Sequence, residues 1–243
     1  MNLLTKTILM LNIWISPSFI HAQWRLGSTF GATLNHFTFD KQYMEDRHFC
    51  NGWGVTAGFS SQFDFLESRK WRIGIRSDLS WILKDYRVYW KTIYGSFVST
   101  GKSGDIKTPM SYYIFNHYIQ LPIMVSIRYG RRLSCSGVLG CYGAYWLYSS
   151  FYGVTHYGFT ELDNYTLRNH FYTINFNSQR DQRFEYGFVG GIGCEWPFRE
   201  HWTIQIQTLW YHGLTSTQKD YMIIKSPRYN DTFVLQAGMF YNF

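Results

Sequence analysis

Apolar and polar side chains alternate without a break along residues 115–129, FNHYIQLPIMVSIRY. The odd positions carry aliphatic and aromatic side chains with one histidine, and the even positions carry mostly polar ones, including Arg128. Because successive side chains of a β-strand point to opposite faces, this pattern predicts a strand with one apolar and one polar face. Its backbone N–H and C=O groups would be unpaired in lipid, so the strand needs hydrogen-bonded neighbours on both sides.

Seven further segments show the same period of two, over residues 24–37, 53–66, 71–84, 134–147, 184–196, 202–214 and 231–243. The connections between them alternate long and short, as in outer-membrane barrels with long outer loops and tight periplasmic turns. The sequence therefore predicts an all-β fold, an eight-stranded antiparallel up-and-down transmembrane β-barrel over residues 23–243. Pro122 lacks a ladder donor, so we expect a β-bulge there.

Aromatic residues fall at both ends of the predicted apolar faces. One ring comprises Trp24, Phe65, Trp71, Tyr129, Trp196, Trp202 and Tyr241. The other comprises Trp53, Trp81, Phe115, Tyr145, Phe184, Trp210 and Phe233. Two such belts mark the two interfaces of a membrane. A soluble, lipocalin-like barrel would also alternate, but it would turn its apolar face inward and would have no reason to form two rings.

Composition favours lipid contact through strands rather than helices. Aromatic residues make up 21% of the chain and charged residues only 16%, yet the mean hydropathy is slightly negative. Beyond the N-terminal segment, no stretch approaches the roughly 18 consecutive apolar residues of a transmembrane helix. The hydrophobicity is instead spread over alternate positions, as in a barrel.

The N-terminal segment, residues 1–22, reads as a secretory signal peptide rather than a short buried helix. Lys6 supplies a positive region, residues 8–15 an apolar core, and Ala22 a small residue at the cleavage site. The net charge of +7 includes no basic run typical of a nucleic-acid arm. We therefore expect an outer-membrane location, outer-membrane lipid and the assembly machinery as partners, and no nucleic acid.

The four cysteines, Cys50, Cys135, Cys141 and Cys194, include no CxxC pair. A zinc or redox motif is thus not indicated, and we expect no metal or cofactor. The last three fall on apolar strand faces, where they are most simply small lipid-facing residues, although export would permit a disulfide.

The polar strand faces converge on the barrel interior. An eight-stranded barrel is just wide enough for its own side chains. We therefore expect a network of ion pairs and hydrogen bonds that blocks conduction, formed by Arg25, Asp64, Arg72, Arg76, Asp78, Gln120, Arg128, Glu185, Glu195, Gln205 and Gln207. The alternative is a narrow polar path for small solutes.

Catalytic residues are not indicated. Barrel enzymes that hydrolyse lipids place His and Ser close together near the outer rim, and the chain has no His-x-Ser. His36, His117 and His212 fall on apolar faces near strand ends, where each is most simply an interfacial side chain. We therefore expect a protein that is not an enzyme, with lipid headgroup chemistry as the minor alternative.

Short motifs resemble the PorT-like family of outer-membrane β-barrel proteins over nearly all of the mature chain. The family's central strand often reads Tyr-x-Glu-x-Pro followed by an aliphatic residue, and here Tyr118, Gln120 and Pro122 fit, with Gln replacing Glu. Similar motifs follow at Gly140, Tyr142 and Tyr145, at Glu185, Gly187, Gly191 and Gly193, and at Tyr211, Gly213 and Leu214. The resemblance implies a barrel, and one branch of the family takes part in type IX protein secretion.

The connection over residues 148–183 is far longer than a hairpin needs and is rich in aromatics. Disordered loops are poor in aromatics, so we expect this one to fold back as extended strands outside the membrane. Its expected surface comprises Tyr152, Tyr157, Phe159, Tyr165, Phe171 and Tyr172. These residues either cap the barrel mouth or bind an envelope or secretion protein or a surface glycan.

Overall fold

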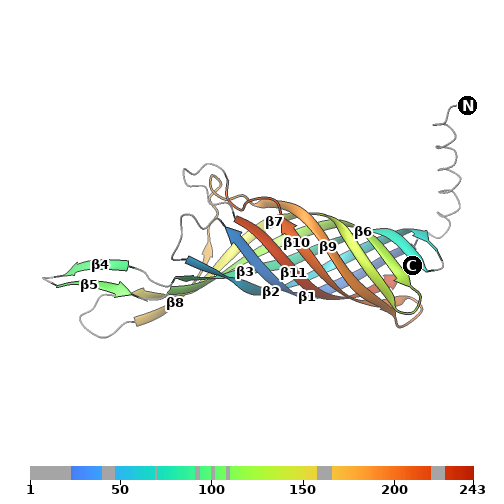
Figure 1. Cartoon of the computed structure of the whole chain (residues 1–243), viewed down its shortest axis with the longest axis horizontal. Helices are drawn as coiled ribbons and strands as arrows, with labels where there is room; N and C mark the ends of the chain where they lie inside the picture. The colour runs from blue at the N-terminus through green and yellow to red at the C-terminus, as the bar shows by residue number, and fades with distance from the viewer. Residues whose placement is uncertain are drawn as a thin grey trace, which may run out of the picture.

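The computed structural model describes residues 23–39, 47–68, 70–90, 94–99, 102–107, 110–157, 166–219 and 228–243. The predicted signal peptide lies outside these residues. Eight strands form a closed ring (Figure 1): β1 (Gln23–Phe39), β2 (Arg47–Glu67), β3 (Trp71–Trp90), β6 (Met110–Gly130), β7 (Ser134–Tyr157), β9 (Phe184–Pro197), β10 (Trp202–Gly213) and β11 (Arg228–Asn242).

Every neighbouring pair in this ring is antiparallel, and pairing of β1 with β11 closes it. The predicted eight-stranded up-and-down barrel is thereby confirmed. Three further strands, β4 (Tyr94–Ser99), β5 (Lys102–Lys107) and β8 (Thr166–Ile174), lie in the long connections beyond one end of the ring (Figure 1). We call this end the loop end and the opposite one, which carries the short turns, the turn end.

The described part of the chain contains no helix that is long and apolar enough to span a membrane.

Exposure along the strands follows the predicted period of two. On β10, Thr203, Gln205 and Gln207 are buried, whereas Ile204 and Ile206 are exposed. The same inversion recurs around the ring, where exposed large apolar side chains cover the outside and buried polar ones fill the inside. A soluble protein would show the reverse arrangement, because water rather than lipid would surround it.

The predicted bulge at Pro122 is wrong. Pro122 pairs with Tyr142 on β7, and on the β3 side the register is the same before and after it, with only the contacts opposite Asp78 and Leu79 missing. Loss of one N–H donor interrupts the ladder here without inserting a residue. A β6–β7 bulge does occur nearer the loop end, where His117 pairs with Tyr148 but Tyr118 pairs with Trp146, so Leu147 is the extra residue.

Beyond the loop end, β2, β3, β6 and β7 extend past the ring and form a sheet together with β8 (Figure 1). We call this five-stranded sheet the outer extension; it comprises residues 47–51, 86–90, 110–115, 149–157 and 166–174. One of its faces packs Tyr86 and Val88 against Phe37, with Tyr112 and Ile114 alongside. The expectation that the long connection folds back as strands agrees with the β7–β8 pairing.

Candidate functional site

The barrel interior holds buried ion pairs in three layers, beginning near the turn end. Glu195 on β9 accepts from Arg25 Nη1 at 2.9 Å and from Arg128 Nη1 at 3.3 Å. Arg128 also pairs with Asp64, so one carboxylate from β2 and one from β9 share this guanidinium. Gln205 Nε2 donates to the other Glu195 oxygen at 3.1 Å. Two arginines thus face two carboxylates, and the layer is formally neutral.

The middle layer is organised around Arg76, which is fully buried. Its Nε and Nη2 donate to the two oxygens of Asp78 at 2.8 and 2.9 Å, a bidentate pair. Its Nη1 donates to Gln205 at 2.6 Å and to Gln207 at 2.7 Å, on the opposite wall. The guanidinium therefore bridges the interior between β3 and β10.

The third layer, toward the loop end, centres on Glu185. Lys84 Nζ lies 2.5 Å from Glu185 Oε1, and the Tyr142 hydroxyl donates to the same oxygen at 2.7 Å. Asn230 Nδ2 donates to the other oxygen at 2.6 Å. The ammonium also lies over the Tyr118 ring, 4.8 Å from its centroid. A cation, a carboxylate and aromatic rings thus contact one another in this layer.

Two of the predicted interior residues lie apart from these ion pairs. Gln120 is fully buried on β6, two residues before Pro122 and paired with Ser80 of β3. The sequence had suggested that Arg72 pairs across the interior, but this side chain is only partly buried and forms no such pair. It instead lines a polar pocket of about 410 Å³ at the turn end with Glu67, Ser68, Gly130 and Arg131. Arg72 lies at the turn-end mouth of the barrel because β3 begins one residue before it.

Several interior residues were missed. Phe240 is fully buried between Arg25 and Arg76, whose guanidinium carbons lie 5.1 and 5.3 Å from its ring centroid. Phe240 occupies an even position on β11, as Gln236 does, and this shared strand face could have predicted that Phe240 points into the interior. Gln62 and the tyrosines Tyr118, Tyr142 and Tyr211 are likewise buried inside.

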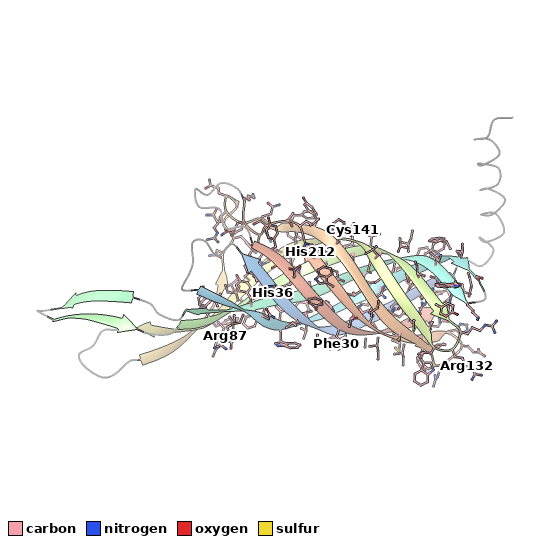
Figure 2. The ribbon with its side chains drawn as sticks, viewed as in Figure 1. Phe30, His36, Arg87, Arg132, Cys141 and His212 are labelled. Atoms are coloured by element: carbon pink, nitrogen blue, oxygen red, sulfur yellow. The ribbon has the colours of Figure 1, made fainter. Side chains whose placement is uncertain are left out.

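The outer extension presents a second candidate surface on the face opposite its buried cluster. Arg87, Tyr113, Tyr152 and Phe171 follow one another in register across β3, β6, β7 and β8. The Arg87 guanidinium lies 5.4 Å from the Tyr113 ring centroid, and the Tyr113 and Tyr152 centroids are 6.4 Å apart. Tyr152 is 40% and Phe171 70% exposed. We call these four residues the aromatic row; Figure 2 shows Arg87 at its β3 end.

Of the six loop aromatics singled out in the sequence, Tyr152 and Phe171 lie in this row. Tyr157 and Tyr172 lie on β7 and β8, where only their backbone is described. Phe159 and Tyr165 fall outside the described residues. Arg87 and Tyr113 were missed, because the sequence places them in the connection that precedes residue 115 and gives no sign that β3 and β6 extend so far.

His36, His117 and His212 lie near the loop end of the barrel wall, and each is at least partly exposed. His117 stacks between Trp81 and Tyr148, with centroids 5.6 and 4.1 Å away, as an interfacial side chain would. Within the described ranges, no three His, Cys, Asp or Glu side chains are placed to hold a metal ion. The four cysteines are exposed and unbridged.

Three solved structures to which the chain is similar are distant from it in sequence. The chain is similar to the outer membrane protein OprG from Pseudomonas aeruginosa, with 13% identity over 91% of this chain and 96% of that one, and a TM-score of 0.44. Ail, the attachment invasion locus protein of Yersinia pestis, has 12% identity over 90% of this chain and 98% of its own, with a TM-score of 0.36. The outer membrane protease OmpT from Escherichia coli has 9% identity over 93% of this chain and 97% of its own, with a TM-score of 0.39.

A search of curated proteins returned no match. A family model does match, however, over residues 17–219, and its description is outer membrane protein beta-barrel domain. This match spans most of the chain and agrees with the closed ring of eight strands. The chain belongs to the outer membrane protein beta-barrel domain family and is an outer-membrane β-barrel protein.

Proposed function

We propose that this protein is a non-enzymatic scaffold of the outer membrane whose outer extension binds another envelope protein. The aromatic row is the observation that carries the proposal. Tyr152 and Phe171 of the row are exposed, and Arg87 and Tyr113 are partly exposed. Tyrosine, phenylalanine and arginine are the side chains enriched at the centres of protein interfaces. The buried cluster on the opposite face already supplies the packing that holds the extension together, so the row is not needed for that purpose.

The edge of the extension supports the same proposal. Among the described strands, β8 pairs only with β7, so its other side offers unpaired N–H and C=O groups. An added strand from a partner can satisfy such an edge while its side chains lie along the row. The resemblance to the PorT-like family suggests that the partner belongs to a protein secretion assembly of the type IX kind.

The alternative is a structural role in which these aromatics cap the barrel mouth and bind no partner. The alternative of a solute pore is disfavoured by the three ion-pair layers that fill the interior. A cap predicts no loss of partners when exposed aromatics are removed, whereas a binding surface predicts such a loss.

Partner capture tests the proposal. Tagged wild-type protein and the double variant Tyr152→Ser/Phe171→Ser are purified from membranes, and co-purifying proteins are compared. The matched control is Phe198→Ser, an exposed aromatic on the β9–β10 turn at the other end of the barrel. We expect the double variant, and a deletion of residues 155–175, to lose specific partners that the control retains.

Two results would count against it. Identical partner and secreted-protein profiles for wild type and folded deletion variant would leave only the cap. Retained protein partners together with lost binding to purified surface glycan would reassign the row to glycan recognition.

A further inference from the structure

Four polar side chains point outward from neighbouring strands at the loop end of the barrel. His36 on β1 and His212 on β10 both lie opposite Asp231 on β11, one on each side. Asn51 on β2 adjoins His36. We call these four residues the histidine row. Figure 2 shows His36 and His212 near each other on this part of the wall.

Both imidazoles of the row are held through the same ring nitrogen. His212 Nδ1 donates to Asp231 Oδ1 at 2.6 Å, and His36 Nδ1 donates to Asn51 Oδ1 at 2.7 Å. An amide or carboxylate oxygen can only accept, so the proton lies on Nδ1 in each case. Nε2 is therefore the atom that each ring offers outward. Because the rings stand on strands and are tied to neighbouring strands, they are already oriented for a ligand.

The row lies just beyond the hydrocarbon. Outward apolar residues run from Trp24 to Leu34 on β1 and from Trp202 to Trp210 on β10. A tilted strand crosses the hydrocarbon core with about 9–11 residues, and the next outward position on each strand is the histidine. The Trp210 ring lies 5.5 Å from His212 and stacks on Phe233, as expected of the outer aromatic belt. The histidine row thus faces the lipid headgroups.

We propose that the histidine row binds a phosphate group on an outer-leaflet lipid. A protonated imidazole donates from both nitrogens, and its Nε2–H can bond a phosphate oxygen with charge assistance. When protonated, His212 and His36 each supply one such outward donor from Nε2, because Nδ1 is already held by Asp231 or Asn51. The two rings stand two strand spacings, roughly 10 Å, apart, so one headgroup can contact both.

The neighbours of the row narrow the choice of ligand. Asp231 is hydrogen-bonded to His212; β9 contributes Phe188 opposite His212, and β2 contributes Asn51, which is hydrogen-bonded to His36. A metal ion is disfavoured, since the described residues hold no suitable group of three ligands. Hydrolysis is also disfavoured, because in the described part of the chain no serine is hydrogen-bonded to either ring.

Imidazole NMR on the full-length protein in neutral detergent micelles tests the site directly. Signals of ¹⁵N-labelled histidine are assigned with His36→Gln and His212→Gln. Three matched probes follow: dilauroyl phosphatidic acid, dilauroylglycerol with the same chains but no phosphate, and inorganic phosphate. We expect phosphatidic acid to shift both signals to saturation. Dilauroylglycerol should not shift them, and inorganic phosphate should bind more weakly than phosphatidic acid.

The double variant His36→Gln/His212→Gln should bind phosphatidic acid about tenfold more weakly, the loss expected for one charge-assisted hydrogen bond. His201→Gln, an exposed histidine on the β9–β10 turn, should bind as the wild type does. Unchanged affinity in the double variant, or equal shifts with dilauroylglycerol, would overturn the proposal. Equal affinity for inorganic phosphate would overturn the lipid assignment, and release of laurate would replace binding with hydrolysis.

Discussion

The barrel interior and the outer extension are built from the same strands but bury opposite kinds of side chain. Inside the ring, β3 and β6 bury Arg76 and Arg128. In the extension, the same faces of these two strands carry the buried Val88 and the partly buried Tyr112. Within the membrane, lipid covers the outside, so polar groups are directed inward and must pair there. Beyond the membrane, water covers both faces, and the extension is held by apolar packing as in a soluble sheet.

The comparison also separates structural from functional roles. Most of the interior charges are satisfied within the barrel, whereas the aromatic row faces outward without completing a core. Changes inside should therefore alter folding, and changes in the row should alter binding.

The largest effect is expected inside. Glu195→Gln leaves Arg25 and Arg128 buried with one carboxylate between them, and breaking a buried pair typically costs about 3–5 kcal/mol of unfolding free energy. Guanidinium unfolding from lipid vesicles measures this. Glu200→Gln on the exposed β9–β10 turn is the control, with about 0.5 kcal/mol or less expected. Equal losses in both variants would mean that the interior pairs are not stabilising.

Lipid-facing positions should follow, with a dependence on depth. Ile75→Arg places a charge in the middle of the hydrocarbon and should cost about 2–4 kcal/mol, whereas Trp53→Arg at the rim should cost about 0–1. The same unfolding assay compares them. Protein that stays soluble and folded without detergent would contradict the membrane assignment of this face.

Conduction sharpens the view of the interior as closed. Wild-type protein, with or without residues 155–175, should show no steady current in planar bilayers. Arg76→Ser/Phe240→Ser removes the largest side chains of the middle layer and should permit one, if the variant folds. Steady ohmic current from the intact protein would favour the narrow pore instead.

The smallest stability effects belong to the aromatic row. Tyr152→Ser on the exposed face should change the unfolding free energy by about 0.5 kcal/mol or less, while abolishing partner capture. Tyr112→Ser on the packed face should cost roughly 2 kcal/mol and leave capture intact in folded protein. The reverse pattern would show that the two faces have been assigned the wrong roles.

The eight strands and their lipid-facing sides could be predicted because alternation is local. Side chains at i and i+2 share a face whatever the rest of the chain does, so Ile73 and Ile75 already imply that Arg72 and Arg76 face the other way. The aromatic belts then supplied the direction of lipid. None of this required knowledge of which strands meet across the interior.

Pairing and reach were decided only by the closed ring. Arg76 on β3 meets Gln207 on β10 because the stagger of the strands brings these opposite walls to one height, a property of the whole barrel. The extra residue Leu147 exchanges the faces of everything after it on β7, so Tyr152 points outward although its even number matches the buried Tyr142. His36 and His212 likewise become neighbours only because β11 sets Asp231 between them. A local pattern fixes the side of a strand on which a residue stands, but its partners depend on register, which only tertiary closure determines.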